Sequence, residues 1–152
     1  MCRFASFILT KDQEFWLPDS DKHEDIISRH KLHPDGAKGP NIVRVEIVPG
    51  PTITRFDDYA GWILTFDQDV FPHWHDAIES QARARAALLR RALEGFTTVD
   101  VSGCTALISL DAKAAKTVYA SGCTALTSLD AKAAEYVDAS GCTALKGRKW
   151  KG

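Results

Sequence analysis

The sequence predicts an α+β fold in which a small ββαββα domain precedes a short, three-turn β-solenoid. The first observation is that residues 1–95 alternate strand-like and helix-like patterns and contain no repeat. The second is that residues 96–145 repeat with a fixed period, which is typical of stacked units that bury their apolar sides against one another. The third is that residues 146–152 are mostly basic, as in a solvated tail or end cap. We therefore expect three parts with these bounds.

Four strands are expected in the N-terminal domain. Residues 3–10 and 14–17 are largely apolar and are separated by a polar turn, so they predict an antiparallel pair. Residues 41–48 alternate apolar and charged side chains before a Pro-Gly-Pro stop, which predicts a strand with one buried face. Residues 62–67 form another short apolar run, which predicts the fourth strand.

A short helix is expected between the second and third strands. Asp21 and Glu24 have the D-x-x-E spacing of a capping box, which predicts a helix that runs to about Lys31. The residues expected to face inward are Ile26, Ile27 and His30.

A longer amphipathic helix is expected to close the domain. Pro72 suits the first turn of a helix, because its missing amide proton would have no partner there, and Gly95 ends the apolar pattern. The expected buried face, with apolar residues at helical spacing, is Ile78, Ala82, Ala86, Leu89 and Leu93. The arginines that lie mostly off this face are Arg83, Arg85, Arg90 and Arg91. We expect the helix to lead into the repeat and to cap its first unit.

The repeat region consists of two nearly identical copies and a partial third. The full copies span 99–117 and 118–136, and the third begins at Val137 and stops after Leu145. The period of 19 residues is marked by the cysteines Cys104, Cys123 and Cys142.

The apolar slots follow the spacing L-x-x-L-x-L-x-x-C-x-x-L, which resembles the consensus of leucine-rich repeats. In the first copy these slots hold Phe96, Val99, Val101, Cys104 and Leu107. The stretch 107–112 resembles the return limb of the short bacterial repeats of effector type. The resemblance implies a leucine-rich-repeat-like β-solenoid in which alternate strand residues point inward. It also implies a structural role for the cysteine of each copy, because Asn or Cys fills this slot in the family and satisfies backbone groups.

Zinc binding and disulfide formation are the alternatives for these cysteines. Parallel, in-register side chains present their sulfur atoms poorly to one another, and three in a row cannot all pair. No C-x-x-C or H-E-x-x-H spacing occurs, and the rings of His73 and His75 would leave opposite sides of a helical turn. We therefore expect structural, buried free thiols at Cys104, Cys123 and Cys142, and no metal or other cofactor.

Four short motifs resemble a group of small uncharacterised proteins of bacteriophages and prophages. They are residues 1–7 (MCRFASF), 19–27 (DSDKHEDII), 43–47 (VRVEI) and 67–69 (DQD). In that group such a domain precedes varied C-terminal pieces, including repeats. The resemblance implies a phage-type accessory protein in the cytosol of a bacterial host, with a host protein as its partner. Inhibition of a host defence protein is one such role.

The outward positions of the repeat strands predict a protein-binding surface. Side chains two apart on a strand share a face, so six outward residues would form two rows. The rows are Thr98, Thr117 and Tyr136, and Asp100, Tyr119 and Asp138. These residues differ between otherwise similar copies, so packing does not require them, and aromatic rings beside carboxylates suit a basic partner.

Two alternatives stay open. The first is a small hydrolase or transferase in residues 1–95, in which Cys2 acts with His23 or His30, as an N-terminal nucleophile if Met1 is removed. Carboxylates beside His23 in the sequence suit a general base, but we expect them to cap the helix instead. The second alternative is a small-ligand site near Trp16, Trp62 and Trp74.

Composition narrows the class of protein. The 152 residues are 45% hydrophobic and 26% charged, which is typical of a globular chain and excludes a disordered one. Nineteen Lys and Arg against twenty Asp and Glu give a net charge of −1, which argues against a nucleic-acid-binding protein. No apolar run approaches the roughly 18 residues of a membrane span, and the N-terminus does not resemble a signal peptide. We therefore expect a cytoplasmic protein without membrane contact, in an oligomeric state that the sequence leaves open.

Overall fold

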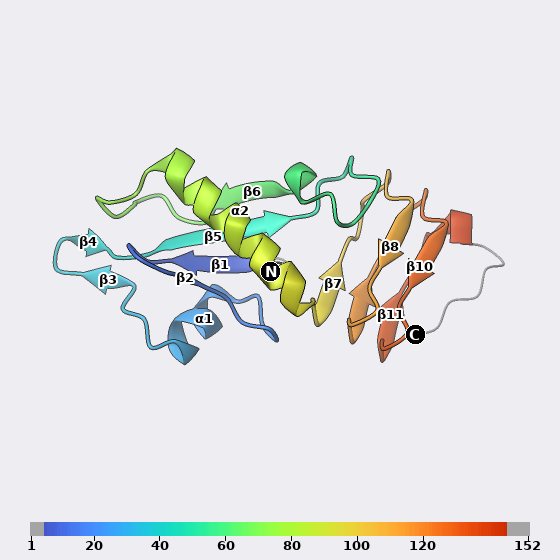
Figure 1. Cartoon of the computed structure of the whole chain (residues 1–152), viewed down its shortest axis with the longest axis horizontal. Helices are drawn as coiled ribbons and strands as arrows, with labels where there is room; N and C mark the ends of the chain where they lie inside the picture. Colours follow the sequence, from blue (N-terminus) through green and yellow to red (C-terminus); the bar gives the residue numbers. More distant parts are fainter. Residues whose placement is uncertain (1–4, 146–152) are drawn as a thin grey trace. The chain divides into compact units, whose positions relative to one another are not determined.

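The computed structural model describes residues 5–145, and its fold is of the mixed α+β class that the sequence predicts (Figure 1). The chain divides into two compact units. The first contains the residues up to Val48 together with Leu64–Leu93, and the second contains Pro49–Ile63 together with the residues from Glu94 onward. The segment 49–63 thus belongs with the repeat, whereas the sequence placed it in the N-terminal domain.

A four-stranded sheet lies at the centre of the first unit. Its strands, in order across the sheet, are β2 (Glu14–Phe15), β1 (Ser6–Leu9), β5 (Val43–Val48) and β6 (Ile63–Phe66). β1 is antiparallel to β2 and to β5, with Phe7 opposite Val45 and Ile8 opposite Arg44. These four strands confirm the sequence prediction.

The described residues outside this sheet and outside the repeat strands form six further elements. They are α1 (His23–Arg29), α2 (Ala77–Glu94), β3 (Asp35–Gly36), β4 (Gly39–Pro40), η1 (Tyr59–Gly61) and η2 (Thr143–Leu145).

The two faces of this sheet pack against different helices. On one face, Ile8 shares a buried cluster with Ile26 of α1. On the other face, the Phe7 ring lies 6.0 Å from the guanidinium of Arg91 in α2. Figure 1 shows α2 crossing the strands of the sheet.

Helix α1 lacks the expected capping box. Lys22 rather than Asp21 is the N-cap residue, and its side chain makes no capping bond. The Asp21 carboxylate instead accepts bonds from a main-chain amide of β1 (3.2 Å) and from Arg91 (2.6 Å), because the tertiary fold brings these donors to it. His30, which we expected to face inward, is exposed because the helix ends before it, and its ring nitrogen lies 3.3 Å from the Trp16 carbonyl oxygen.

Helix α2 buries the face opposite to the expected one. It begins at Ala77 rather than near Pro72, because the Asp76 carboxylate caps it and accepts bonds from two first-turn amides at 2.9 and 3.0 Å. Its buried residues are Ser80, Ala84, Ala87, Leu88 and Arg91. All five residues expected inside are exposed, with Ile78 at 83% and Leu93 at 89%.

Ion pairs with Glu14 of β2 and with Asp21 account for this orientation. Arg83 and Arg90 donate to the Glu14 carboxylate at 3.0 and 2.5 Å, and Arg91 donates to Asp21 while only 3% exposed. Burial alone would raise the pKa of Glu14, but the hydrogen bonds from the two arginines hold this pKa below its ordinary value. Long arginine stems cover apolar surface while their heads reach carboxylates, so arginines that the sequence places in solvent lie at an interface.

The repeat copies stack in register in the second unit. Their strands are β7 (Thr98–Asp100), β9 (Thr117–Tyr119) and β11 (Tyr136–Asp138) in one parallel sheet, and β8 (Ser109–Asp111) and β10 (Ser128–Asp130) in another. Val118 pairs with Val99 on one side and with Val137 on the other, so each strand pairs with its equivalent in the next copy. Each copy turns at a glycine with positive φ, a conformation that other residues rarely adopt: Gly103, Gly122 and Gly141.

The segment 49–63 covers the first copy. A parallel bridge joins Arg55 to the start of β8. The Thr54 carbonyl accepts a bond from the Ile108 amide (2.9 Å), just as the Ile108 carbonyl accepts one from the Thr127 amide (2.8 Å) in the next copy. The segment therefore takes the place of a preceding copy, although its sequence lacks the repeat pattern.

Aromatic side chains form the core of this covering. Trp62 is 1% exposed, and its ring lies 6.0 Å from that of Phe96 and 5.3 Å from that of Phe56. The Trp62 indole N–H donates to the Phe56 carbonyl (3.1 Å). The sequence assigned the covering of the first copy to the preceding helix, whereas within the second unit these contacts come from the segment 49–63.

Candidate functional site

The outward residues of β7, β9 and β11 form the two rows that the sequence predicts. The strand register aligns Thr98, Thr117 and Tyr136 in one row and Asp100, Tyr119 and Asp138 in the other. The rings of Tyr119 and Tyr136 contact each other, with centroids 5.8 Å apart and planes at 57°. Tyr119 is 38% exposed and Tyr136 is 54% exposed, so the ring pair is open to solvent.

The two aspartates beside the rings have local hydrogen bonds. Asp100 accepts a bond from the Ser102 amide (3.0 Å), and Asp138 accepts one from the Ser140 amide (3.0 Å). Hydrogen bonds from the Ser140 hydroxyl and amide hold the pKa of Asp138 below its ordinary value. An aspartate at this position therefore helps to close the turn after the strand. Tyr119, at the same position of the second copy, has no carboxylate to accept such a bond.

The cysteines of the repeat are buried and bond to backbone carbonyls. Cys123 Sγ donates to the Val101 carbonyl (3.1 Å), and Cys142 Sγ donates to the Ala120 carbonyl (2.9 Å). Cys104 Sγ lies 4.0 Å from the carbonyl oxygen of Pro49, in the segment that replaces a preceding copy. All three are free thiols.

Burial keeps these thiols protonated. It raises the pKa of Cys104 and Cys142, and it raises that of Cys123 to about 11, with smaller contributions from the neighbouring cysteines. Because the thiolate is the form that attacks electrophiles and binds metals, their environment suits structural rather than reactive cysteines.

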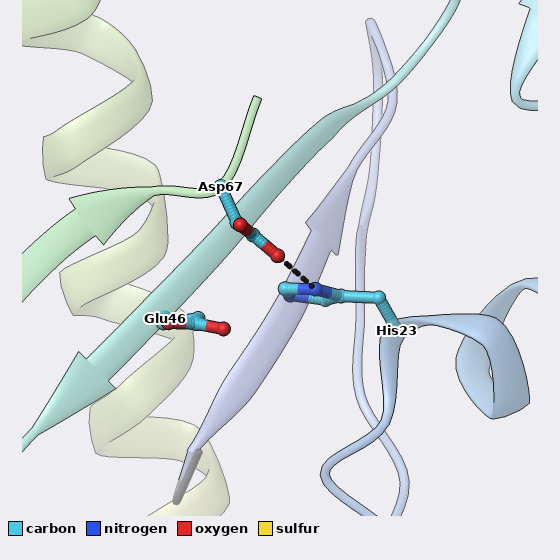
Figure 2. Close-up of side chains that lie close together, drawn as sticks. All are labelled: His23, Glu46 and Asp67. Carbon is cyan, nitrogen blue, oxygen red and sulfur yellow. Dashed lines mark ion pairs between the residues drawn. The ribbon is translucent and has the colours of Figure 1, made fainter. Parts of the chain in front are cut away.

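His23 lies in a polar cluster that the sequence did not indicate. It is the first residue of α1 and is 5% exposed. Its Nε2 lies 3.0 Å from the Val45 carbonyl oxygen, and its Nδ1 lies 3.5 Å from Asp67 Oδ2. Glu46 of β5 joins them, and one potential ligand atom from each of His23, Glu46 and Asp67 lies within 4.8 Å of the other two. Figure 2 shows both carboxylates directed toward the imidazole ring from different segments.

Two carboxylates close to His23 in the sequence have other partners. Ser20 donates to Asp25 (2.6 Å), and Asp21 binds Arg91. Sequence reasoning therefore singled out His23 but not Glu46 and Asp67, which lie near it in the structure. Glu46 and Asp67 do occur within the motifs 43–47 and 67–69, but those motifs indicated no chemistry.

The three tryptophans have different surroundings. Trp62 is buried in the second unit, and Trp16 lies beneath the guanidinium of Arg90 at 5.2 Å. Trp74 lines a hollow of about 180 Å³ in the first unit. The other lining residues of this hollow are Lys11, Asp12, Asp76, Glu79, Ser80 and Arg83. Of the three tryptophans in the hypothesis of a small-ligand site, only Trp74 lines this hollow, and the other lining residues include both acidic and basic side chains.

Two of the sequence hypotheses concern residues outside the described range. Cys2 and the basic tail 146–152 both lie there, so the pairing of Cys2 with His23 stays a hypothesis. No α-helix within residues 5–145 is long and apolar enough to cross a membrane.

Comparison with known proteins identifies no relative. No family model matches the chain, and neither a curated protein nor a solved structure is significantly similar to it.

Proposed function

We propose that this protein is a protein-binding module whose recognition surface is the outward face of β7, β9 and β11. We infer that residues 96–145 form a short solenoid of the leucine-rich-repeat type, which presents this face. The observation that carries the proposal is the exposed pair Tyr119 and Tyr136, whose rings contact each other at 5.8 Å.

Packing does not account for the two rings. The slots equivalent to Tyr136 hold Thr98 and Thr117, and those equivalent to Tyr119 hold Asp100 and Asp138. A tyrosine brings a large amphipathic contact area with few rotatable bonds to immobilise, which makes it a frequent interface anchor. Two such rings side by side give a compact centre for an interface.

The chemistry of the border indicates the kind of partner. Asp100 and Asp138 occupy the row of Tyr119, so the ring pair has carboxylates beside it. Like charges across an interface are costly, so an acidic border favours a partner surface with exposed Arg or Lys. The motifs that resemble phage proteins support a bacterial host protein as this partner, and its inhibition by occlusion as the result.

The test exchanges each ring for a residue that the repeat already carries in the same slot. The double variant Tyr119→Asp and Tyr136→Thr should fold with a stability change of less than about 1 kcal/mol. The immobilised wild-type chain first captures proteins from a bacterial lysate, and these proteins are identified. Each captured protein is then purified, and its affinity for the wild-type chain and for the double variant is measured. We expect the double variant to bind its partner at least tenfold more weakly, which corresponds to about 1.4 kcal/mol.

A matched control distinguishes binding through this face from nonspecific binding through any exposed apolar side chain. Ile108 is 50% exposed next to the other sheet, and the second copy has Thr127 in its place, so Ile108→Thr also copies a residue of the repeat. The control should bind as the wild type does. Equal binding by a folded double variant would show that recognition lies elsewhere, most simply on the first unit.

A further inference from the structure

We propose that the partner of the tyrosine surface adds an extended, basic segment of its backbone to the edge of β11. This inference rests on the proposed function and names the kind of segment that the surface receives. In the part of the repeat that the structure describes, β11 and β10 are the last strands of their two sheets (Figure 1). Tyr136, one of the two exposed rings, is the first residue of β11, so this edge is continuous with the tyrosine surface.

Main-chain groups at this edge lack the partners that their equivalents have in the preceding copy. The Ala120 amide donates to the Asp138 carbonyl (2.7 Å), and the Lys116 carbonyl accepts a bond from the Glu135 amide (2.7 Å). The equivalent groups one copy later are the Ala139 amide and the Glu135 carbonyl, and no hydrogen bond within residues 5–145 satisfies either of them. An edge with unpaired donors and acceptors is a template on which another chain can form a strand.

The apolar interior of the last copy is also partly open. Val118 and Ala120 are 0% exposed, because β9 has a strand on each side. Their equivalents one copy later, Val137 and Ala139, are only half-buried. Since neighbouring strands lie about 4.8 Å apart, alternate apolar side chains of an added strand would cover these two positions. An extended segment would thus supply both the backbone pairing and the missing apolar cover.

The charge of the last copy indicates which side chains this segment carries. Residues 128–145 contain one basic side chain, Lys132, and three carboxylates, those of Asp130, Glu135 and Asp138. Glu135 directly precedes β11 and Asp138 ends it, so a segment paired with this strand passes both carboxylates. Opposite charges on paired strands attract, which favours Arg or Lys at the facing positions of the segment.

The first measurement determines whether the edge is open in the full chain. Amide hydrogen exchange, followed by NMR, compares Ala139 with its hydrogen-bonded equivalent Ala120. In the free chain the Ala139 amide should exchange at least tenfold faster. Equal protection of the two amides would mean that the chain itself covers the edge, with residues 146–152 as the nearest candidates, and the proposal would be wrong.

The second measurement identifies the backbone pairing with a library of random linear peptides displayed on phage. The immobilised full chain should select peptides that alternate apolar and polar residues and are rich in Arg and Lys. Each selected peptide is synthesised with N-methyl groups on one alternate set of its amides or on the other set. Only one set of an added strand faces β11, so methylation of that set should weaken binding at least tenfold, and methylation of the other less than about twofold. Equal effects of the two sets, or a failure to select any peptide, would contradict strand addition.

Matched variants test whether the selected peptides bind at β11. Asp138→Asn keeps an acceptor for the Ser140 amide but removes the charge, so it should weaken peptide binding about fivefold. Asp111→Asn makes the same change at the end of β8, in the other sheet, and should leave the affinity unchanged. The bound peptide should also slow hydrogen exchange at Ala139. Equal effects of the two variants, or unchanged exchange at Ala139, would place the peptide elsewhere and contradict the proposal.

These results are distinguishable from those of the tyrosine test. If Tyr119→Asp and Tyr136→Thr weaken binding of the captured protein but the N-methyl series shows no alternation, the partner binds the rings without adding a strand, and strand addition is wrong. If peptides pair with β11 but the tyrosine variant binds the captured protein normally, β11 is a peptide-binding edge, and the proposed function of the rings is the part that fails.

Discussion

Two of the three repeat thiols donate to a carbonyl of the preceding copy: Cys123 to Val101, and Cys142 to Ala120. A cysteine side chain is small and apolar enough for the interior of a stack, and it still donates to a carbonyl oxygen that also accepts the amide bond of its own turn. This double role explains why the slot keeps the same residue in every copy while the outward slots vary.

The raised thiol pKa predicts a loss of stability at high pH. The folded chain holds the pKa of Cys123 at about 11, against an ordinary value of 9.0. Between these values the unfolded chain releases the proton and the folded chain keeps it, so the free energy of unfolding falls as pH rises from about 9 to about 11. Denaturant unfolding at several pH values measures this slope.

Cys123→Ser is the matched variant for this slope. A serine keeps the donor but does not titrate in this range, so its stability should fall less steeply with pH than that of the wild type. Lysines and tyrosines titrate in both chains and cancel in the comparison. Identical slopes would mean that the thiol is not held in its neutral form.

At the scale of elements, the orientation of α2 is tested by two adjacent leucines. Leu88 is 1% exposed and Leu89 is 53% exposed. Leu88→Ala removes buried side-chain volume and should cost about 2–5 kcal/mol. Leu89→Ala makes the same chemical change in solvent and should stay within about 0.5 kcal/mol. The midpoint of urea unfolding measures both.

The orientation expected from the sequence gives the opposite order. In that arrangement Leu89 would be buried and would be the costly position. A larger loss for Leu89→Ala than for Leu88→Ala would therefore contradict the helix packing described above.

Strands were predictable and the helix face was not, for a physical reason. A two-residue alternation such as that of Val43, Val45 and Ile47 has only one apolar face to bury. Helix α2 has apolar residues at helical spacing on both sides, with Ala84, Ala87 and Leu88 opposite Ile78 and Leu89. The choice between the two sides is made by the carboxylates Glu14 and Asp21, which lie some 70 residues earlier.

Of the two candidate sites, the sequence predicted one fully and the other only in part. The tyrosine pair was predictable because a fixed period converts sequence position directly into spatial rows. The polar cluster around His23 was predictable only as far as His23 itself, because Glu46 lies in β5 and Asp67 follows β6, with no fixed spacing from His23. Only the sheet order brings these two to the start of α1.

At the scale of the whole chain, the repeat depends on residues that precede it by a long stretch of sequence. The first copy needs the Thr54 carbonyl and the Trp62 ring, and both belong to the segment 49–63. A fragment of residues 96–152 lacks these contacts. Because each copy of a stacked array buries apolar surface only against its neighbours, we expect this fragment to be largely unfolded.

Circular dichroism and thermal melting of the fragment measure this expectation. The full chain serves as the control and should melt cooperatively. Cooperative melting of the isolated fragment would instead mean that the copies supply enough burial for themselves, and that the segment 49–63 is a dispensable cover.

The in-register stacking also bears on how such a chain can change length. The bond from the Val101 amide to the Tyr119 carbonyl (2.8 Å) recurs one copy later from Ala120 to Asp138 (2.7 Å), so each junction between copies has the same geometry. A further 19-residue unit inserted between two copies would meet the same partners on both sides. Every insertion would add one outward position to each row and leave the interior unchanged. Duplication or loss of a unit therefore widens or narrows the outward face of this sheet in steps, without requiring any compensating substitution in the core.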